Sequence, residues 1–580
     1  MKRLITLIVL LSGLTFACVP DMDLVDPNRI TTESFYQTEG ELIGAVNGAY
    51  NILQRSGGWG RYMFYAINGK GEDFTFTFKA SAGMKEVPPM CNYTITADNR
   101  IPTMVYENLY VMVYAANLAI EKIQEADQVE NTALKNRLLG EAYFLRGLAY
   151  FYLTMNFGNE IPYRDQTPQN EEDYFLGPLE KGKMFDYIVA DFKLAESLLP
   201  QRSVMYADPA NVGRATKGSA QAYLAKAYMY KPILMWDSPE NQSDWNAAKT
   251  VLKSIIDSAE YELMYNYRDN HTEQFENNKE SLFEVQFYNN ETGAFNDAVS
   301  EDYIADWGQS DQSTWRQQEV GMMDAGGDNS TWWNMQPTVR LYNEFERNGT
   351  DSIIDSRYAM SMWGPDGARY QKVAGGRWTS YTSWLSGANA IHQGEWFGTR
   401  KYCGDVATTD WETGINDRLI RYSDILLMYA ECLLETNDPV GAATYINMVR
   451  ARSNHNLNIT EDGADSRMLY AVQEGILPTV EDLIAAAPTI NGVVINNLYR
   501  ALRHERAIEL FGEGWRFFDL LRWSVTPSHQ ADNVLEPLRN KELDSEGNLL
   551  YGYSDNKNEF MPIPATELAI NKKMKGNIAN

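Results

Sequence analysis

The chain has 580 residues, of which 44% are hydrophobic, and its formal net charge is −27. The hydrophobic content predicts a globular protein with one large core or several smaller ones. The negative charge excludes nucleic-acid binding, because a phosphate backbone requires a basic face. With four Cys, five His and no C-x-x-C pair, the sequence predicts neither a metal site nor a bound cofactor.

The N-terminus has the pattern of an export signal. Two basic residues precede an apolar run over 4–16, and Ala17 precedes Cys18. A run this short is typical of a signal peptide, not of a membrane span. We expect a lipoprotein signal over 1–17 and a tether over 18–38 that is lipidated at Cys18. The alternative is a plain secretory signal followed by an incidental cysteine.

Helical periodicity dominates the N-terminal part, which we assign to residues 39–260. Helices are predicted over 39–54, 102–124, 134–156, 179–199, 216–236 and 245–258. The Gly-rich, aromatic stretch over 59–90 instead predicts a loop or a short irregular strand. Helix pairs of this size resemble tetratricopeptide hairpins, which bury their apolar faces by stacking on neighbouring hairpins.

The C-terminal part, residues 261–580, begins with different patterns. A strand is predicted over 281–287, and the region 300–411 is irregular and rich in Trp. An irregular stretch of this length is typically functional. Helical repeats resume over 418–434 and 441–453, and the chain is predicted to end as coil over 551–580.

The stretch from Arg503 to Trp523 mixes charged and aromatic residues most densely. It predicts a helix up to Phe511, a stop at Gly512 and Gly514, and a second helix. Its Glu, His and Arg residues suggest catalysis, but we favour a buried, ion-paired helix hairpin that braces the C-terminal part.

Five stretches occur in the order typical of one known family. They are 146–162 (Arg-Gly-Leu-Ala-Tyr-Phe-Tyr-Leu, then Phe157-Gly158 and Ile161-Pro162), 213–226, 421–431, 505–523 and 562–571. Together they resemble the SusD/RagB family, the surface glycan-binding lipoproteins of Bacteroidetes. The acidic residues Asp21, Asp23 and Asp26 also resemble the tag that exports such lipoproteins to the cell surface.

This resemblance implies a mainly α-helical, tetratricopeptide-like scaffold with a large loop-rich region that holds the ligand. It also implies a non-catalytic protein of the outer-membrane surface that binds oligosaccharide, or peptide in some branches of the family. The implied partner is a SusC-like TonB-dependent transporter, which imports the ligand.

A sugar site needs flat aromatic rings for stacking and polar side chains for hydroxyl groups. Two stretches supply both, 59–79 and 303–333, and a third and weaker candidate covers 377–396. In the resembled family, an early loop and a mid-chain region form the ligand platform. Our candidate ligand-binding residues are Tyr65, Asp73, Phe74, Tyr303, Trp315, Arg316, Trp332 and Trp333. The alternative for each aromatic residue is packing in the core.

Two other classes of function were weighed. A glycoside hydrolase would use paired carboxylates, but no pair has a distinctive sequence context, and no G-x-S-x-G, H-E-x-x-H or P-loop motif occurs. An interaction scaffold is the second class, since helical repeats commonly bind proteins. Because the chain is acidic, we expect a neutral glycan in preference to a polyanionic one.

Overall fold

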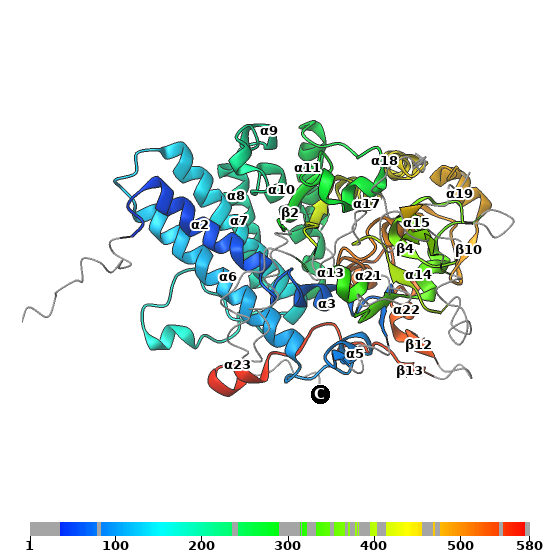
Figure 1. Ribbon diagram of the computed structural model, residues 1–580, viewed down its shortest axis with the longest axis horizontal. Coiled ribbons are helices and arrows are strands. Elements are labelled where there is room, and N and C mark those ends of the chain that lie inside the picture. The colour runs from blue at the N-terminus through cyan, green and yellow to red at the C-terminus, as the bar shows by residue number, and fades with distance from the viewer. Residues whose placement is uncertain are drawn as a thin grey trace, which may run out of the picture.

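The computed structural model describes residues 35–77, 83–234, 242–288, 314, 316–321, 332–347, 353–365, 369–371, 378–379, 381, 395–402, 413–454, 468–469, 476–543 and 549–574. Within these ranges, long helices form one end of the molecule, and short strands with irregular segments form the other (Figure 1). The predicted signal peptide, Cys18, Tyr303 and Trp315 lie outside the described residues.

The N-terminal part is a stack of helices that follow one another in space as in sequence. They are α2 (Glu39–Gln54), α6 (Arg100–Glu125), α7 (Thr132–Phe157), α8 (Lys183–Leu198), α10 (Lys217–Tyr230) and α11 (Gln242–Asp257). Each packs on the next, and α11 packs on α17 (Tyr422–Glu435) of the C-terminal part. The sequence predicted all six to within a few residues, and the tetratricopeptide-like hairpin arrangement is confirmed.

Local chemistry explains where these helices begin. Thr38 forms a capping box with Glu41, and Asn99, Asn131 and Thr216 cap α6, α7 and α10. Such caps satisfy amide groups that have no partner within the helix. The helices α7 and α10 are buried on nearly every side, so they form the centre of the stack.

The strands form small antiparallel sheets. The pairs are β1 (Phe74–Phe76) with β3 (Met335–Pro337), β2 (Ser281–Val285) with β8 (Asp417–Arg421), β4 (Met362–Trp363) with β7 (Gly398–Thr399), β10 (Thr489–Ile490) with β11 (Val493–Val494), and β12 (Glu542–Leu543) with β13 (Leu549–Tyr551). The strand β5 (Arg369–Gln371) lies between β6 (Trp378–Thr379) and β9 (Met468–Leu469). The strand β3 directly follows the mid-chain stretch 303–333, and Thr77 donates to the carbonyl oxygen of Trp333, so the early and mid-chain stretches proposed for the ligand platform meet.

Short helices complete the described structure. They are α3 (Tyr62–Asn68), α5 (Val87–Cys91), α9 (Arg202–Met205), α13 (Arg316–Val320), α14 (Val339–Glu344), α15 (Arg357–Ser361), α19 (Val480–Ala486), α22 (Glu536–Arg539) and α23 (Ala565–Ile570). The 3-10 helices are η1 (Glu171–Tyr174), η2 (Pro209–Asn211), η3 (Lys231–Leu234), η4 (Tyr267–His271), η5 (Glu273–Phe275) and η8 (Gln530–Asp532). Among the described residues, no helix combines the length and hydropathy needed to cross a membrane.

Three sequence predictions were wrong in detail. The stretch 59–90 contains α3 and α5, because tertiary burial of all seven residues of α3 overrides a weak local helical pattern. Residues 418–421 belong to a strand that pairs with β2, not to the following helix. The C-terminal coil contains the helix α23.

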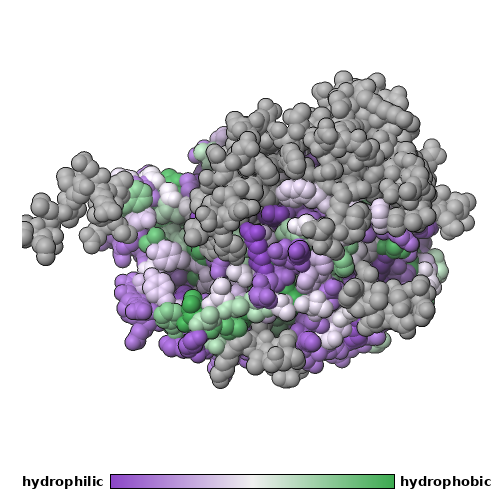
Figure 2. Space-filling view, turned by 60° about the horizontal axis from the view of Figure 1, so that its bottom comes forward, coloured by the Kyte–Doolittle hydropathy of each residue, from purple (hydrophilic) through white to green (hydrophobic). Residues whose placement is uncertain are grey.

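Exposed hydrophobic side chains gather in the helical half. Tyr114, Tyr174 and Ile570 are 48%, 55% and 65% exposed. They line a cleft of about 580 Å³ between α6, residues 162–175 and α23. Figure 2 shows hydrophobic residues gathered toward the lower left of one face, in this half of the molecule. An exposed apolar patch of this kind is typical of a surface that binds a partner.

The charged stretch from Arg503 to Trp523 forms the predicted hairpin, with α20 (Leu498–Glu509) and α21 (Arg516–Val525). The glycines at the stop have positive φ, +74° at Gly512 and +83° at Gly514, a conformation that favours glycine. Buried Arg506 donates to Asp424 and to Asp519, both at 2.8 Å. These contacts join α20 to α17 and α21.

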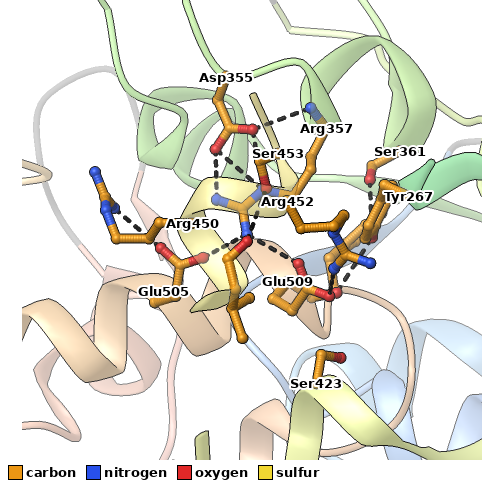
Figure 3. A network of polar contacts seen from close by, with 12 residues as sticks. Tyr267, Asp355, Arg357, Ser361, Ser423, Arg450, Arg452, Ser453, Glu505 and Glu509 are labelled. Carbon is orange, nitrogen blue, oxygen red and sulfur yellow. Dashed lines mark hydrogen bonds and ion pairs between the residues drawn. The ribbon is translucent and has the colours of Figure 1, made fainter. Parts of the chain in front are cut away.

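A second buried network joins α20 to α18 (Pro439–Arg452) and to the irregular region (Figure 3). Glu505 bonds Arg357 at 2.5 Å and Arg450 at 3.0 Å, while Glu509 bonds Arg357 at 2.9 Å and also Arg452. Asp355 holds the remaining side of Arg357 at 2.8 Å. The structural interpretation of this charged stretch is therefore confirmed.

Candidate ligand-binding surface

The early stretch builds core as well as surface. Phe74 is fully buried and stacks on Phe511, with ring centroids 4.9 Å apart. Tyr65 is also fully buried, and its hydroxyl accepts a hydrogen bond from Asn334 at 3.0 Å. Burial raises the pKa of Tyr65 well above its usual value. In this conformation neither ring offers a face to a sugar, which corrects the predicted stacking role of both residues.

Asp73 is also buried, with 5% of its surface exposed. Its Oδ1 has no hydrogen-bond partner among the described residues. Burial and then the adjacent charge of Glu72 raise the pKa of Asp73 to about 7. Asp73 lines none of the described clefts, so a direct hydrogen bond between Asp73 and a ligand does not fit this position.

Arg316 has a structural role at the start of α13. Its guanidinium donates to the carbonyl oxygen of Trp59 at 2.8 Å and to Asp417 at 2.9 Å. It also lies 4.0 Å from the centroid of the Phe64 ring. Only 3% of Arg316 is exposed, and these contacts engage its charge. The same contacts join the early stretch to β8.

The neighbouring residues Trp332 and Trp333 differ in environment. Trp333 is fully buried, and its indole Nε1 donates to the carbonyl oxygen of Phe397 at 2.9 Å. Its φ of +46° is rare for a bulky side chain. Trp332 remains partly exposed. The predicted ligand-facing role therefore stays open for Trp332 and does not fit Trp333.

Arg61 is the charged neighbour of Trp332. Its guanidinium carbon lies 5.4 Å from the centroid of the Trp332 ring and equally far from that of Tyr62. Its Nε donates to Glu319 at 2.6 Å, which joins α3 to α13. Burial lowers the pKa of Arg61, but Glu319 more than offsets this and holds it above its usual value. Arg61 therefore stays charged beside the partly exposed indole ring.

Trp332 and Arg61 form a small surface with two of the properties that a sugar site needs. The indole supplies a flat apolar ring, and the guanidinium supplies donors for hydroxyl groups. Sequence reasoning missed Arg61, because its contact with Glu319 spans 258 positions of the chain. Among the described residues, no group of three His, Cys, Asp or Glu side chains could hold a metal ion.

The fold is a helical-repeat scaffold with a loop-rich face, and sequence comparison names its family. The sequence model of the SusD family matches residues 279–579, which is more than half of the chain. A second model, described as starch-binding and associating with the outer membrane, matches residues 76–229. The chain belongs to the SusD family.

Curated relatives match across the whole length. SusD-like protein P2 of Formosa agariphila is 24% identical over 99% of both chains. SusD-like protein P25 of the same organism is 23% identical over 88% of both chains.

Solved structures share the fold. A SusD superfamily protein from Bacteroides vulgatus matches with a TM-score of 0.67 and 22% identity over 94% of this chain and all of its own. A SusD homologue from Bacteroides thetaiotaomicron matches with a TM-score of 0.70 and 20% identity over 94% of this chain and 98% of its own. A SusD-like protein described as laminarin-binding has a TM-score of 0.66 and 20% identity over 94% of this chain and all of its own.

Proposed function

We propose that this protein binds an oligosaccharide at the cell surface and passes it unchanged to a SusC-like TonB-dependent transporter. The observation that carries the proposal is membership of the SusD family, which covers both halves of the chain. Relatives of the same fold are described as laminarin-binding or as surface glycan-binding proteins. Cys18 would anchor the protein to the outer membrane through lipid.

We assign the ligand to the face that carries Trp332 and Arg61. Tyr303 and Trp315 remain proposed members of this site, since they belong to the same mid-chain stretch as Trp332. A sugar ring stacked on Trp332 would bring its hydroxyl groups within reach of the Arg61 guanidinium. Catalysis is not part of this proposal, because stacking and hydrogen bonding hold a sugar without activating water.

We assign the transporter to the helical half. The cleft between α6 and α23 combines exposed Tyr114, Tyr174 and Ile570 with a mainly apolar lining. Exposed apolar surface of this kind stabilises protein contacts when it is buried. The two assignments place ligand and transporter on different segments of the chain.

Glycan retardation tests the function. The mature protein is run on native gels that contain laminarin, starch or no glycan, and titration calorimetry follows with any glycan that retards it. We expect retardation by at least one neutral glycan and a weaker effect in a Trp332→Ala protein. A peptide ligand is the alternative, and binding to a peptide library with no binding to glycans would favour it.

A further inference from the structure

A cavity of about 750 Å³ lies in the C-terminal half of the molecule, and neither Trp332 nor Arg61 lines it. Its walls come from segments 72–75, 336–344, 490–495, 500–520 and 532–541, together with Glu395. The elements β10, α14 and α22, which contribute residues to its lining, lie close together on the right in Figure 1. Its volume is within the range of ligand pockets and would hold one or two sugar rings.

Although the protein as a whole is acidic, the lining of this cavity has slightly more basic than acidic side chains. It contains six basic side chains, namely Arg340, Arg500, Arg503, His504, Arg516 and Lys541. Burial lowers the pKa of His504, but Glu344 and Glu346 raise it to about 9, so His504 is charged at neutral pH. The described lining includes five acidic residues and no Trp, Tyr or Phe. It therefore offers charge and hydrogen bonds but no ring for stacking.

Most of these charges are already paired within the protein. Arg500 and Arg503 both bond Asp532, and His504 bonds Glu344 at 2.9 Å. Glu344 also accepts from Asn491 at 2.5 Å, at the tip of the β10–β11 hairpin. These pairs fix the walls and leave little free charge on them.

Arg340 and one carboxylate oxygen of Glu72 are the exceptions. The guanidinium of Arg340 makes no hydrogen bond or ion pair with any residue that the structure describes, although it lines the cavity. Glu72 is 5% exposed, and its Oε1 accepts from Arg516 at 2.6 Å. The other oxygen, Oε2, is buried without a partner among the described residues. A buried acceptor without a donor is costly, so a ligand hydroxyl at this position would be stabilising.

We propose that this cavity binds an anionic sugar unit, with its carboxylate or sulfate on Arg340 and a ring hydroxyl donating to Glu72 Oε2. Guanidinium binds planar carboxylates and sulfate-like anions with paired hydrogen bonds. The net charge of −27 does not prevent this, since repulsion from distant charges is screened beyond about 8–10 Å at physiological salt. The site is separate from the aromatic surface and does not depend on Trp332.

Titration calorimetry with monosaccharides tests the proposal. The probes are D-glucuronate, D-glucose 6-sulfate and D-glucose, with inorganic sulfate as the comparison anion. We expect at least one anionic sugar to bind at least tenfold more tightly than glucose and than inorganic sulfate, and to bind more weakly as salt is raised. The two anionic probes distinguish a carboxylate site from a sulfate site.

Variants locate the binding. Arg340→Gln removes the charge without breaking a described internal bond, so the protein should fold and lose at least tenfold in affinity for the anionic sugar. Arg539→Gln is the matched control, because Arg539 lies on α22, does not line the cavity and bonds Asp555. Glu72→Gln should weaken the binding of the sugar but not that of inorganic sulfate.

Several outcomes would overturn the proposal. They are no binding of either anionic sugar, equal binding of glucose, equal binding of inorganic sulfate, or an Arg340→Gln protein that binds as the wild type does. The Trp332→Ala protein separates the two sites, since its retardation by glycan should be weaker while its affinity for the anionic sugar stays unchanged.

Discussion

At the scale of single residues, burial divides the aromatic residues proposed for ligand binding into core residues and surface residues. Tyr65, Phe74 and Trp333 are core residues with internal contacts, whereas Trp332 is partly exposed beside Arg61. Composition cannot make this distinction, because a ring that stacks on a sugar and a ring that packs in a core are the same residue type. Of the two adjacent indoles, the buried one belongs to Trp333, which has a positive φ.

Alanine substitutions at the two tryptophans should have opposite effects. Trp332→Ala should weaken glycan binding about tenfold, because a lost stacking contact costs roughly 1–1.5 kcal/mol. Trp333→Ala should lower the free energy of unfolding by about 3–5 kcal/mol, because it leaves a buried cavity. Calorimetry and thermal unfolding measure the two effects. The reverse pattern would exchange the roles of these residues.

Asp73 predicts a pH dependence of stability. Its pKa in the folded protein is raised to about 7, so between pH 4 and 7 the folded state binds more protons than the unfolded state. The stability that this proton contributes is present at low pH and is lost as the pH rises through 7. An Asp73→Asn protein, whose side chain does not ionise, should avoid this loss.

Denaturant titrations at pH 5 and pH 8 measure that effect. At each pH, the free energy of unfolding of wild type is subtracted from that of the Asp73→Asn protein. This difference should be roughly 1–3 kcal/mol more favourable to the variant at pH 8 than at pH 5. An Asp555→Asn protein is the control, because Asp555 is at the surface. Equal differences at both pH values would show that Asp73 titrates normally.

At the scale of elements, the hairpin of α20 and α21 connects the C-terminal helices by buried ion pairs. Arg506 lies between Asp424 of α17 and Asp519 of α21, and each of the three is at most 2% exposed. Two arginine bonds lower the pKa of Asp519 against the opposite effect of burial, which keeps the carboxylate charged. Removing one partner of such a group leaves buried charge uncompensated.

Arg506→Ala should therefore lower the free energy of unfolding by about 3–5 kcal/mol. Its glycan affinity, measured per folded molecule, should stay at the wild-type value, since the hairpin touches neither Trp332 nor Arg61 in any described contact. Lys253→Ala is the control, because Lys253 pairs with Asp257 at the exposed surface and should not change the melting temperature. A stable Arg506→Ala protein that had lost glycan binding would make the hairpin part of the site.

At the scale of the whole molecule, helical periodicity predicted the scaffold well. The sequence pattern predicted the six long N-terminal helices, the strand β2 and the hairpin stop at Gly512 and Gly514, because each depends on residues close in sequence. The pattern did not predict the helix α3 or the strand β8, because their conformations depend on partners far along the chain. The same limit applies to Arg61 and Glu319, and to the segments around the cavity that Arg340 lines.

The fold also divides the proposed tasks. Helices α2 to α11 form a stack with an apolar cleft, while the loop-rich half carries Trp332, Arg61 and the cavity that Arg340 lines. A binding protein tethered beside its transporter needs only moderate affinity, because the anchor keeps the local concentration high. Chemistry on the ligand is not required for that role.

The central claim is that the protein binds a glycan through Trp332 and does not cleave it. The most direct measurement combines calorimetry with a reducing-end assay on the same protein and the same glycan, using wild type and Trp332→Ala. The account predicts saturable binding by wild type, about tenfold weaker binding by Trp332→Ala, and no new reducing ends from either. Release of new reducing ends by wild type, or equal affinity of the two proteins, would contradict it.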